Sequence, residues 1–189
     1  MSSLRPMCRL AAALAALSLL VLPARAEVEK FMKQCDMKLC AFFRASTMIP
    51  EGWVEDKEAT DYFNFQMLLP KGVDFEKAPA KIYVLVRYDK DKQLTSSMLR
   101  DNERDWKSRS KKAKIVKLAD FARANGNAAF ERHQFEAPAL SEQGFEEVTL
   151  TSDSDKDGNS FVVEVVLSAN TREAFKASEP DYLSILRAY

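Results

Sequence analysis

The sequence has few of the residues and motifs from which enzyme sites are commonly built. His133 is its one histidine, so a zinc site with several histidine ligands is excluded within one chain. Its 189 residues include only 5 glycines, and they contain no G-x-S-x-G, no H-E-x-x-H and no glycine-rich phosphate loop. Glu146 and Glu147 are adjacent, so a strand would direct them to opposite faces and they predict no acid–base pair. Nothing in the sequence therefore amounts to a catalytic signature.

The chain also lacks an excess of either charge and a long hydrophobic run. It has 28 basic and 28 acidic residues, a balance that argues against a nucleic-acid partner. The longest apolar stretch covers residues 10–22, whereas a helix needs about 20 apolar residues to cross a bilayer. This stretch follows Arg5 and Arg9 and precedes Ala24-Arg25-Ala26, the order of parts in a secretory signal peptide. We expect residues 1–26 to be cleaved, leaving residues 27–189 as one domain in the bacterial periplasm, with no membrane anchor after cleavage.

Only two cysteines, Cys35 and Cys40, remain after such cleavage. An even pair in an oxidising compartment favours a disulfide. Five helical steps would separate the two Cα atoms by roughly 7.5 Å along the axis, beyond the usual span of a bridge. A disulfide therefore requires a turn at residues 36–39, and the alternative is two separately buried thiols. No C-x-x-C motif is present, so thiol–disulfide catalysis is not indicated.

Hydrophobic periodicity predicts an α/β (α+β) domain with an antiparallel β-sheet flanked by helices. Residues 28–34 fit a short helix, and the run at 80–88 is apolar on both faces, as in a central strand. Other strands are expected at residues 39–47 and 61–69, with two hairpins joining 115–124 to 127–137 and 146–151 to 161–167. The dipeptide Asn125-Gly126 supplies the tight turn of the first hairpin.

Two longer helices are expected. The first covers residues 93–114, has a thin apolar face and begins with Thr95 or Ser96 as its cap. The second begins near Ser178, where a possible cap is followed by Pro180. Its apolar residues recur at the spacing of one helix face and should dock on the sheet: Tyr182, Ile185, Leu186 and Tyr189.

The order of these landmarks carries a family resemblance. Ile49-Pro50-Glu51-Gly52-Trp53 precedes the strand at 81–87 and the polar helix, and the strand at 161–167 leads into the C-terminal helix. This order resembles the PsbP-like family, which includes the photosystem II PsbP proteins and bacterial DcrB-type proteins. The resemblance implies an α/β/α sandwich and a non-catalytic protein that works with a partner. It assigns no functional residues.

The segment between residues 153 and 164 fits the pattern of a calcium loop, D-x-D-x-D-G followed by five residues and Glu. Calcium binds six to eight oxygen atoms, and five residues could supply them: Asp153, Asp155, Asp157, Asn159 and Glu164. The flanks read as strands rather than the helices of an EF-hand, and Asp157-Gly158 is also an ordinary hairpin turn. A solvated acidic hairpin tip is therefore the alternative, and no other cofactor is indicated.

We expect an exported, non-enzymatic binding or accessory protein of the bacterial periplasm, whose partner is another protein. One alternative is an immunity protein that neutralises a secreted toxin, which co-purification with the toxin would reveal. Another is a small carboxylate-dependent hydrolase, for which a deep pocket lined by two converging carboxylates would be evidence.

Overall fold

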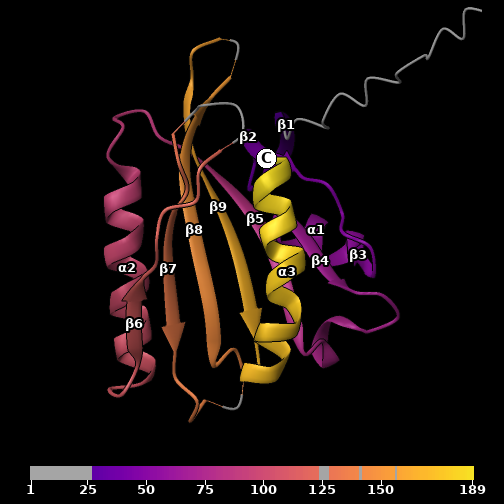
Figure 1. Ribbon diagram of the computed structural model, residues 1–189. Helices are drawn as coiled ribbons and strands as arrows, with labels where there is room; N and C mark the ends of the chain where they lie inside the picture. Colours follow the sequence, from indigo (N-terminus) through magenta and orange to yellow (C-terminus); the bar gives the residue numbers. More distant parts are fainter. Residues whose placement is uncertain (1–26, 124–127, 141, 156) are drawn as a thin grey trace, which may run out of the picture.

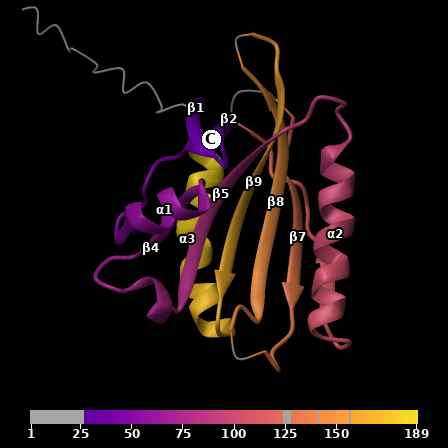
Figure 2. The same ribbon diagram turned by 180° about the vertical axis from the view of Figure 1, so that it is seen from behind.

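The computed structural model describes residues 27–123, 128–140, 142–155 and 157–189. A seven-stranded sheet has the order β3-β4-β5-β9-β8-β7-β6, and β1 and β2 form a separate two-stranded sheet (Figures 1 and 2). Every described strand pair is antiparallel, which confirms the expected fold class. The strands are β1 (Glu27–Cys35), β2 (Lys38–Ser46), β3 (Trp53–Glu55), β4 (Gln66–Pro70), β5 (Ala80–Tyr88), β6 (Lys114–Lys117), β7 (Glu131–Glu136), β8 (Phe145–Ser154) and β9 (Ser160–Ala169). The helices are α1 (Lys57–Phe63), the short 3-10 helix η1 (Phe75–Lys77), α2 (Leu94–Arg109) and α3 (Arg172–Ala188).

The centre of the large sheet is formed by β5, β9 and β8. All nine residues of β5 pair with β9, which confirms the central strand expected at 80–88. On its other edge β9 pairs with β8 along its full length, so both sets of its backbone groups are hydrogen-bonded. The expected hairpin between 146–151 and 161–167 is confirmed and is longer than expected.

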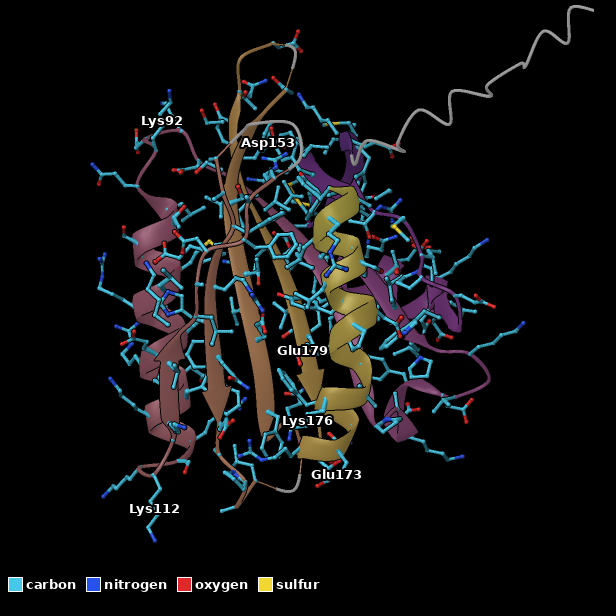
Figure 3. The ribbon with its side chains drawn as sticks, in the orientation of Figure 1. Lys92, Lys112, Asp153, Glu173, Lys176 and Glu179 are labelled. Atoms are coloured by element: carbon cyan, nitrogen blue, oxygen red, sulfur yellow. A yellow bond between two sulfur atoms is a disulfide. The ribbon has the colours of Figure 1, made fainter. Side chains whose placement is uncertain are left out.

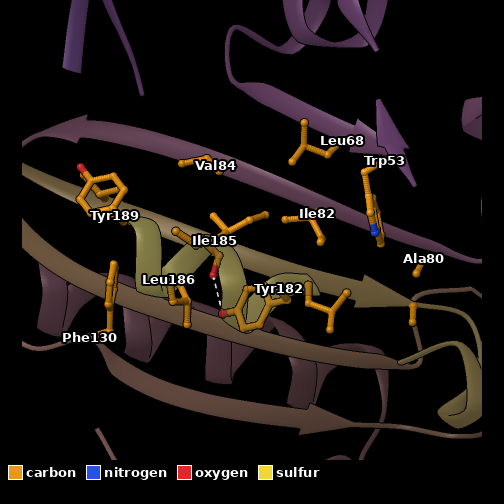
Figure 4. Close-up of a cluster of buried hydrophobic side chains, with 14 of the residues drawn as sticks. Trp53, Leu68, Ala80, Ile82, Val84, Phe130, Tyr182, Ile185, Leu186 and Tyr189 are labelled. Atoms are coloured by element: carbon orange, nitrogen blue, oxygen red, sulfur yellow. Dashed lines mark hydrogen bonds between the residues drawn. The ribbon is translucent and has the colours of Figure 1, made fainter. Parts of the chain in front are cut away.

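The two long helices cover opposite faces of this sheet. On one face, α3 buries Phe175, Tyr182, Ile185 and Leu186 against odd-numbered side chains of β9, and Tyr189, the residue after the helix, joins them. Figure 4 shows Tyr182, Ile185 and Leu186 pointing together into this core. On the other face, Met98, Leu99 and Trp106 of α2 pack against side chains that include Phe135 and Val162. Both expected helices are therefore confirmed. The sheet lies between them, with one apolar core beneath each helix.

The first segment is a strand, and the helix expected at 28–34 is wrong. Residues Glu27–Cys35 pair with Lys38–Ser46 in a hairpin, with Lys30 opposite Phe43 and Phe31 opposite Phe42. The turn carries Asp36 in the left-handed region, with φ of 52°. Cys35 and Cys40 lie beside this turn with their Cα atoms 5.9 Å apart and form the expected disulfide. Cross-strand pairing thus overrides the apolar spacing that suggested a helix.

The boundaries of three other elements differ from expectation. The strand expected at 61–69 begins at Gln66, because Asp56 caps α1 by accepting the backbone N–H of Ala59 at 3.0 Å. Helix α2 is capped by neither Thr95 nor Ser96. Instead the carboxylate of Asp89 accepts the backbone N–H groups of Gln93 and Leu94 at 3.1 and 3.2 Å.

Helix α3 begins earlier than expected, at Arg172, and Ser178 is not its cap. The side chain of Thr171 accepts the N–H of Ala174 at 3.1 Å, while Pro180 lies inside the helix. The first expected hairpin, joining 115–124 to 127–137, is present as β6 and β7, extended by a bridge between Phe121 and Phe130.

Two expectations lie outside the described residues: the signal peptide at 1–26 and the Asn125-Gly126 turn. Among the residues that are described, no helix is long and apolar enough to cross a membrane.

We predict that Leu186→Ala lowers the free energy of unfolding by about 2–5 kcal/mol, because this fully buried side chain fills the core beneath α3. Chemical denaturation followed by circular dichroism measures the change. Lys176→Ala, which removes a side chain that points to solvent from the same helix (Figure 3), is the matched control and should shift the midpoint little. Equal midpoints for Leu186→Ala and the wild type would show that α3 is not held by this contact.

Candidate functional site

A groove of about 730 Å³ lies between the β1–β2 hairpin and the large sheet. This volume is within the range of ordinary ligand sites. The groove, called here the hairpin groove, is lined by Lys30, residues 41–43, 63–65 and 85–88, and Asn159. Four separate parts of the chain besides Lys30 therefore contribute to it, and Figure 1 shows the hairpin and the tip between β8 and β9 at the same end of the molecule.

The hairpin is held against the sheet by its base rather than by its tip. Ala45 is fully buried in the core beneath α3, and the ring of Phe43 lies 4.9 Å from that of Phe161. The backbone N–H of Thr47 donates to the side-chain oxygen of Gln66 at 2.9 Å, which ties the end of β2 to the start of β4. The tip, with Met37 99 % exposed, projects into solvent. The hairpin thus forms one wall of the groove from a fixed base.

The second wall is the segment that joins α1 to β4. Asn64 ends α1 in the left-handed conformation, with φ of 61°, and turns the chain into β4. Phe63 and Phe65 stack with their ring centroids 5.4 Å apart. The ammonium of Lys33 donates to the side chain of Asn64 at 2.9 Å, so this wall is also linked to the hairpin.

The floor of the groove includes the end of β5. Residues 85–88 are consecutive, and consecutive side chains of a strand point to opposite faces. Four consecutive residues can therefore line the same groove only if the groove runs along the edge of the strand, where both faces are reached. The pairings agree, since β4 pairs with β5 only from Ile82 to Val84, while β9 pairs with β5 as far as Tyr88. The groove therefore follows a stretch of strand edge that no described strand pairs with.

The charge of this groove has one sign. Lys30 and Arg87 are its only ionisable lining residues besides Tyr88, and both are exposed. Within the part of the chain that the structure describes, neither takes part in an ion pair. The hairpin groove is therefore aromatic and basic. Sequence reasoning missed it because the lining is assembled from distant segments, although exposed Arg87 and Tyr88 at the end of an apolar strand were a signal.

A second groove, of about 570 Å³, lies on the other side of Phe63 and has the opposite charge. Its four charged lining residues are all acidic: Asp56, Glu58, Asp74 and Glu76. Tyr62, which is 76 % exposed, stands at its margin. The two grooves therefore favour partners, or parts of one partner, with opposite charges.

The structure separates the residues proposed for calcium. Asp155 accepts the backbone N–H groups of Asp157 and Asn159 at 2.9 Å each, and these bonds form the hairpin tip. Asp153 instead accepts a hydrogen bond from Arg123 at 3.0 Å, on the face that α3 covers. Glu164 lies on the opposite face, where it accepts from Asn102 of α2 at 3.1 Å.

The calcium loop is therefore not assembled as a five-residue cage. In the described ranges no group of three or more acidic, histidine or cysteine side chains is placed to hold a metal ion. The tip is held by its own hydrogen bonds, and the side-chain amide of Asn159 lowers the pKa of Asp155. Calcium binding at the tip stays a prediction, to be tested by titration.

Two buried carboxylates lie beneath α2, where sequence reasoning expected no acidic pair. Burial raises the pKa of Glu146 to about 7, an effect that Arg109 opposes and Glu164 increases. Burial also raises the pKa of Glu164, against its hydrogen bond with Asn102. The partly buried Tyr83 interacts electrostatically with both carboxylates. Neither carboxylate lines either groove, so this cluster belongs to the interface between helix and sheet.

Glu147 points to the other face, as the alternation predicted. Its carboxylate is fully buried and accepts from the Nε of Arg132 at 2.7 Å. Beside it Thr149 hydrogen-bonds to the hydroxyl of Tyr182, which donates to the carbonyl of Val165 at 3.1 Å. These polar contacts fix α3 on the sheet. His133 contacts Glu131 at 3.2 Å in β7 and joins no other acidic or histidine side chain described here.

No protein-family model matches the chain, and no curated protein sequence matches it.

We predict that the protein loses stability as pH rises from about 5 to 8, in part through Glu146. Its pKa is about 7 in the folded chain and 4.5 without the fold, so the folded state binds more protons between these values. Across this window the free energy of unfolding falls by up to about 3 kcal/mol, because Glu146 must ionise in its buried site. Glu146→Gln should flatten the dependence measured by urea denaturation. The control Glu173→Gln, at an exposed residue, should leave it unchanged, whereas identical slopes for wild type and Glu146→Gln would contradict the assignment.

We predict that calcium binds the hairpin tip no tighter than about 1 mM, the weak end of extracellular calcium sites. The carboxylate of Glu164 is on the opposite face from Asp153, so Glu164→Gln should leave any calorimetric signal unchanged. Asp155→Asn, which weakens the acceptor at the tip, should reduce it. If calcium binds with a dissociation constant below the millimolar range and Glu164→Gln abolishes this binding, the five-residue calcium site is correct after all.

Proposed function

We propose that this chain is an exported, non-enzymatic binding or accessory protein of the bacterial periplasm, and that it binds a protein partner in the hairpin groove. The observation that carries the proposal is the groove itself. It presents aromatic rings and two basic side chains that make no ion pair within the described residues. Such combinations of aromatic anchors with positive charge are typical of protein-binding sites.

Three further features support a binding role in an exported protein. The disulfide in the hairpin is compatible with an oxidising compartment. The base of the hairpin is anchored in the core, so the groove is largely formed before a partner arrives, which lowers the entropic cost of binding. Helices on both faces of the sheet agree with the sandwich that the PsbP-like resemblance implied, although the family assignment itself stays a proposal.

The hydrolase alternative gains no support from the groove. The described lining of the hairpin groove contains no carboxylate, and the buried pair Glu146 and Glu164 lies beneath α2 instead. The second groove has four, but Asp56 caps α1 and Asp74 pairs with Lys77, so two of them already have structural partners. An acid–base pair must reach a substrate, so carboxylates enclosed between a helix and a sheet are poorly placed for hydrolysis. The immunity-protein alternative is a special case of the proposal, in which the partner is a toxin.

The proposal is tested by capture from a periplasmic extract of the native host, with mass spectrometry to identify bound proteins. We predict that the double variant Lys30→Glu/Arg87→Glu retains at least about tenfold less of the partner than the wild type, because the groove becomes acidic. The matched control is Lys111→Glu/Lys112→Glu, which makes the same charge change at exposed residues beyond the end of α2. The control should capture the partner normally.

Failure takes a definite form in this experiment. Equal capture by the groove variant and the control would place the binding surface elsewhere. Recovery of the chain from the cytoplasm with its first 26 residues intact would contradict the exported location.

A further inference from the structure

The end of β5 provides a template for an added strand. Residues 85–88 are held extended by β9 on one side, and the ladder is prolonged by the bond from the N–H of Asp89 to the carbonyl of Ser160, at 2.8 Å. On the other side β4 has already ended, and β2, which contacts β5 from the hairpin, does not pair with it. Alternate residues of a strand direct their backbone N–H and C=O groups to each edge, so this edge presents unpaired hydrogen-bonding groups in a fixed geometry.

The hairpin groove has the right place for such a strand. It runs along this edge, with β2 and the link between α1 and β4 as its walls, so an extended segment lying there would continue the line of β4. Four strand residues span roughly 13 Å, which is enough for a short recognition motif. The side chains of an added strand would alternate between a face beside Val86 and Tyr88 and a face beside Leu85 and Arg87.

We infer that the hairpin groove binds its partner by β-strand addition, taking an extended acidic peptide segment of another protein onto the edge of β5 at residues 85–88. This inference rests on the proposed function and specifies its chemistry. The acidic character follows from charge complementarity, because Lys30 and Arg87 are the charged lining residues. Neither forms a direct ion pair among the described residues, although the charge of Arg87 also acts on the buried Glu164. An acidic side chain opposite Arg87 would form a charge-assisted hydrogen bond. Apolar side chains at the alternate positions would lie against Val86 and the ring of Phe43.

The test begins with a random library of ten-residue peptides displayed on phage and selected on the intact mature protein. We expect binders in which acidic and apolar residues alternate. A selected peptide, made synthetically, should bind at least about tenfold more weakly when alternate backbone amides are N-methylated, because methylation removes the ladder hydrogen bonds. Arg87→Glu should weaken binding to a similar degree, while Lys112→Glu should not.

Hydrogen exchange locates the added strand. Binding of the peptide should slow exchange of backbone amides within residues 85–88. The exchange rates in β3 and β6, the outer strands of the sheet, should stay unchanged. Recovery of no binder, or of binders insensitive to both N-methylation and Arg87→Glu, would overturn strand addition. A concentration-dependent dimer that the peptide does not dissociate and that protects the same amides would assign the edge to a second copy and also overturn it.

The two proposals fail separately. If the natural partner is lost by Lys30→Glu/Arg87→Glu but does not protect residues 85–88, the groove binds the partner by another mode. If the groove variant captures the partner normally, the proposed function and the strand addition both fail.

Discussion

The structure depends on the burial of both faces of β9. Its odd-numbered side chains pack beneath α3 and its even-numbered valines beneath α2, while β5 and β8 satisfy its backbone on either edge. A strand in this position is stable only when both helices are docked, since removal of either would expose one apolar face to water. Glu164 is the one charged residue in this strand, and the contact with Asn102 gives its carboxylate a hydrogen-bond partner at the α2 interface.

The same arrangement explains where the groove forms. Helix α3 covers much of one face of the sheet, and the base of the β1–β2 hairpin extends that cover through Phe43 and Ala45. The hairpin packs over the face and contacts β5, with Phe43 stacked on Tyr88, but it does not pair with the sheet, so the edge at the end of β5 is left without a paired strand. A concave surface with a strand edge in its floor is thus a result of using a separate small sheet as part of the cover.

The sequence predicted the parts of the fold that local patterns determine. The continuous apolar run of β5, the apolar face of α3 and the alternation in β9 are all recognisable, because burial leaves either an unbroken apolar run or a period of one face in the sequence. Helix and strand were confused at residues 28–34, where a short apolar spacing fits both and pairing with β2 decides. The sequence predicts the start of α3 at Ser178, because Ser178 and Pro180 resemble a helix start, whereas the side chain of Thr171 caps the helix by accepting the N–H of Ala174. The hairpin groove could not be predicted, since no local pattern reports that β4 ends where β5 continues.

Pro180 has a consequence for how α3 opens. Proline has no backbone N–H, so the carbonyl of Lys176 lacks its usual partner in the helix, and the hydrogen-bond chain is interrupted between two halves. The later half carries Tyr182, Ile185 and Leu186 and is held by the core, whereas the earlier half buries only Phe175 and Ser178. The two halves therefore need not open together. The first turns can separate from the sheet in local fluctuations, whereas the last turns are released only when the core unfolds. One helix therefore contains two segments that open at different free energies.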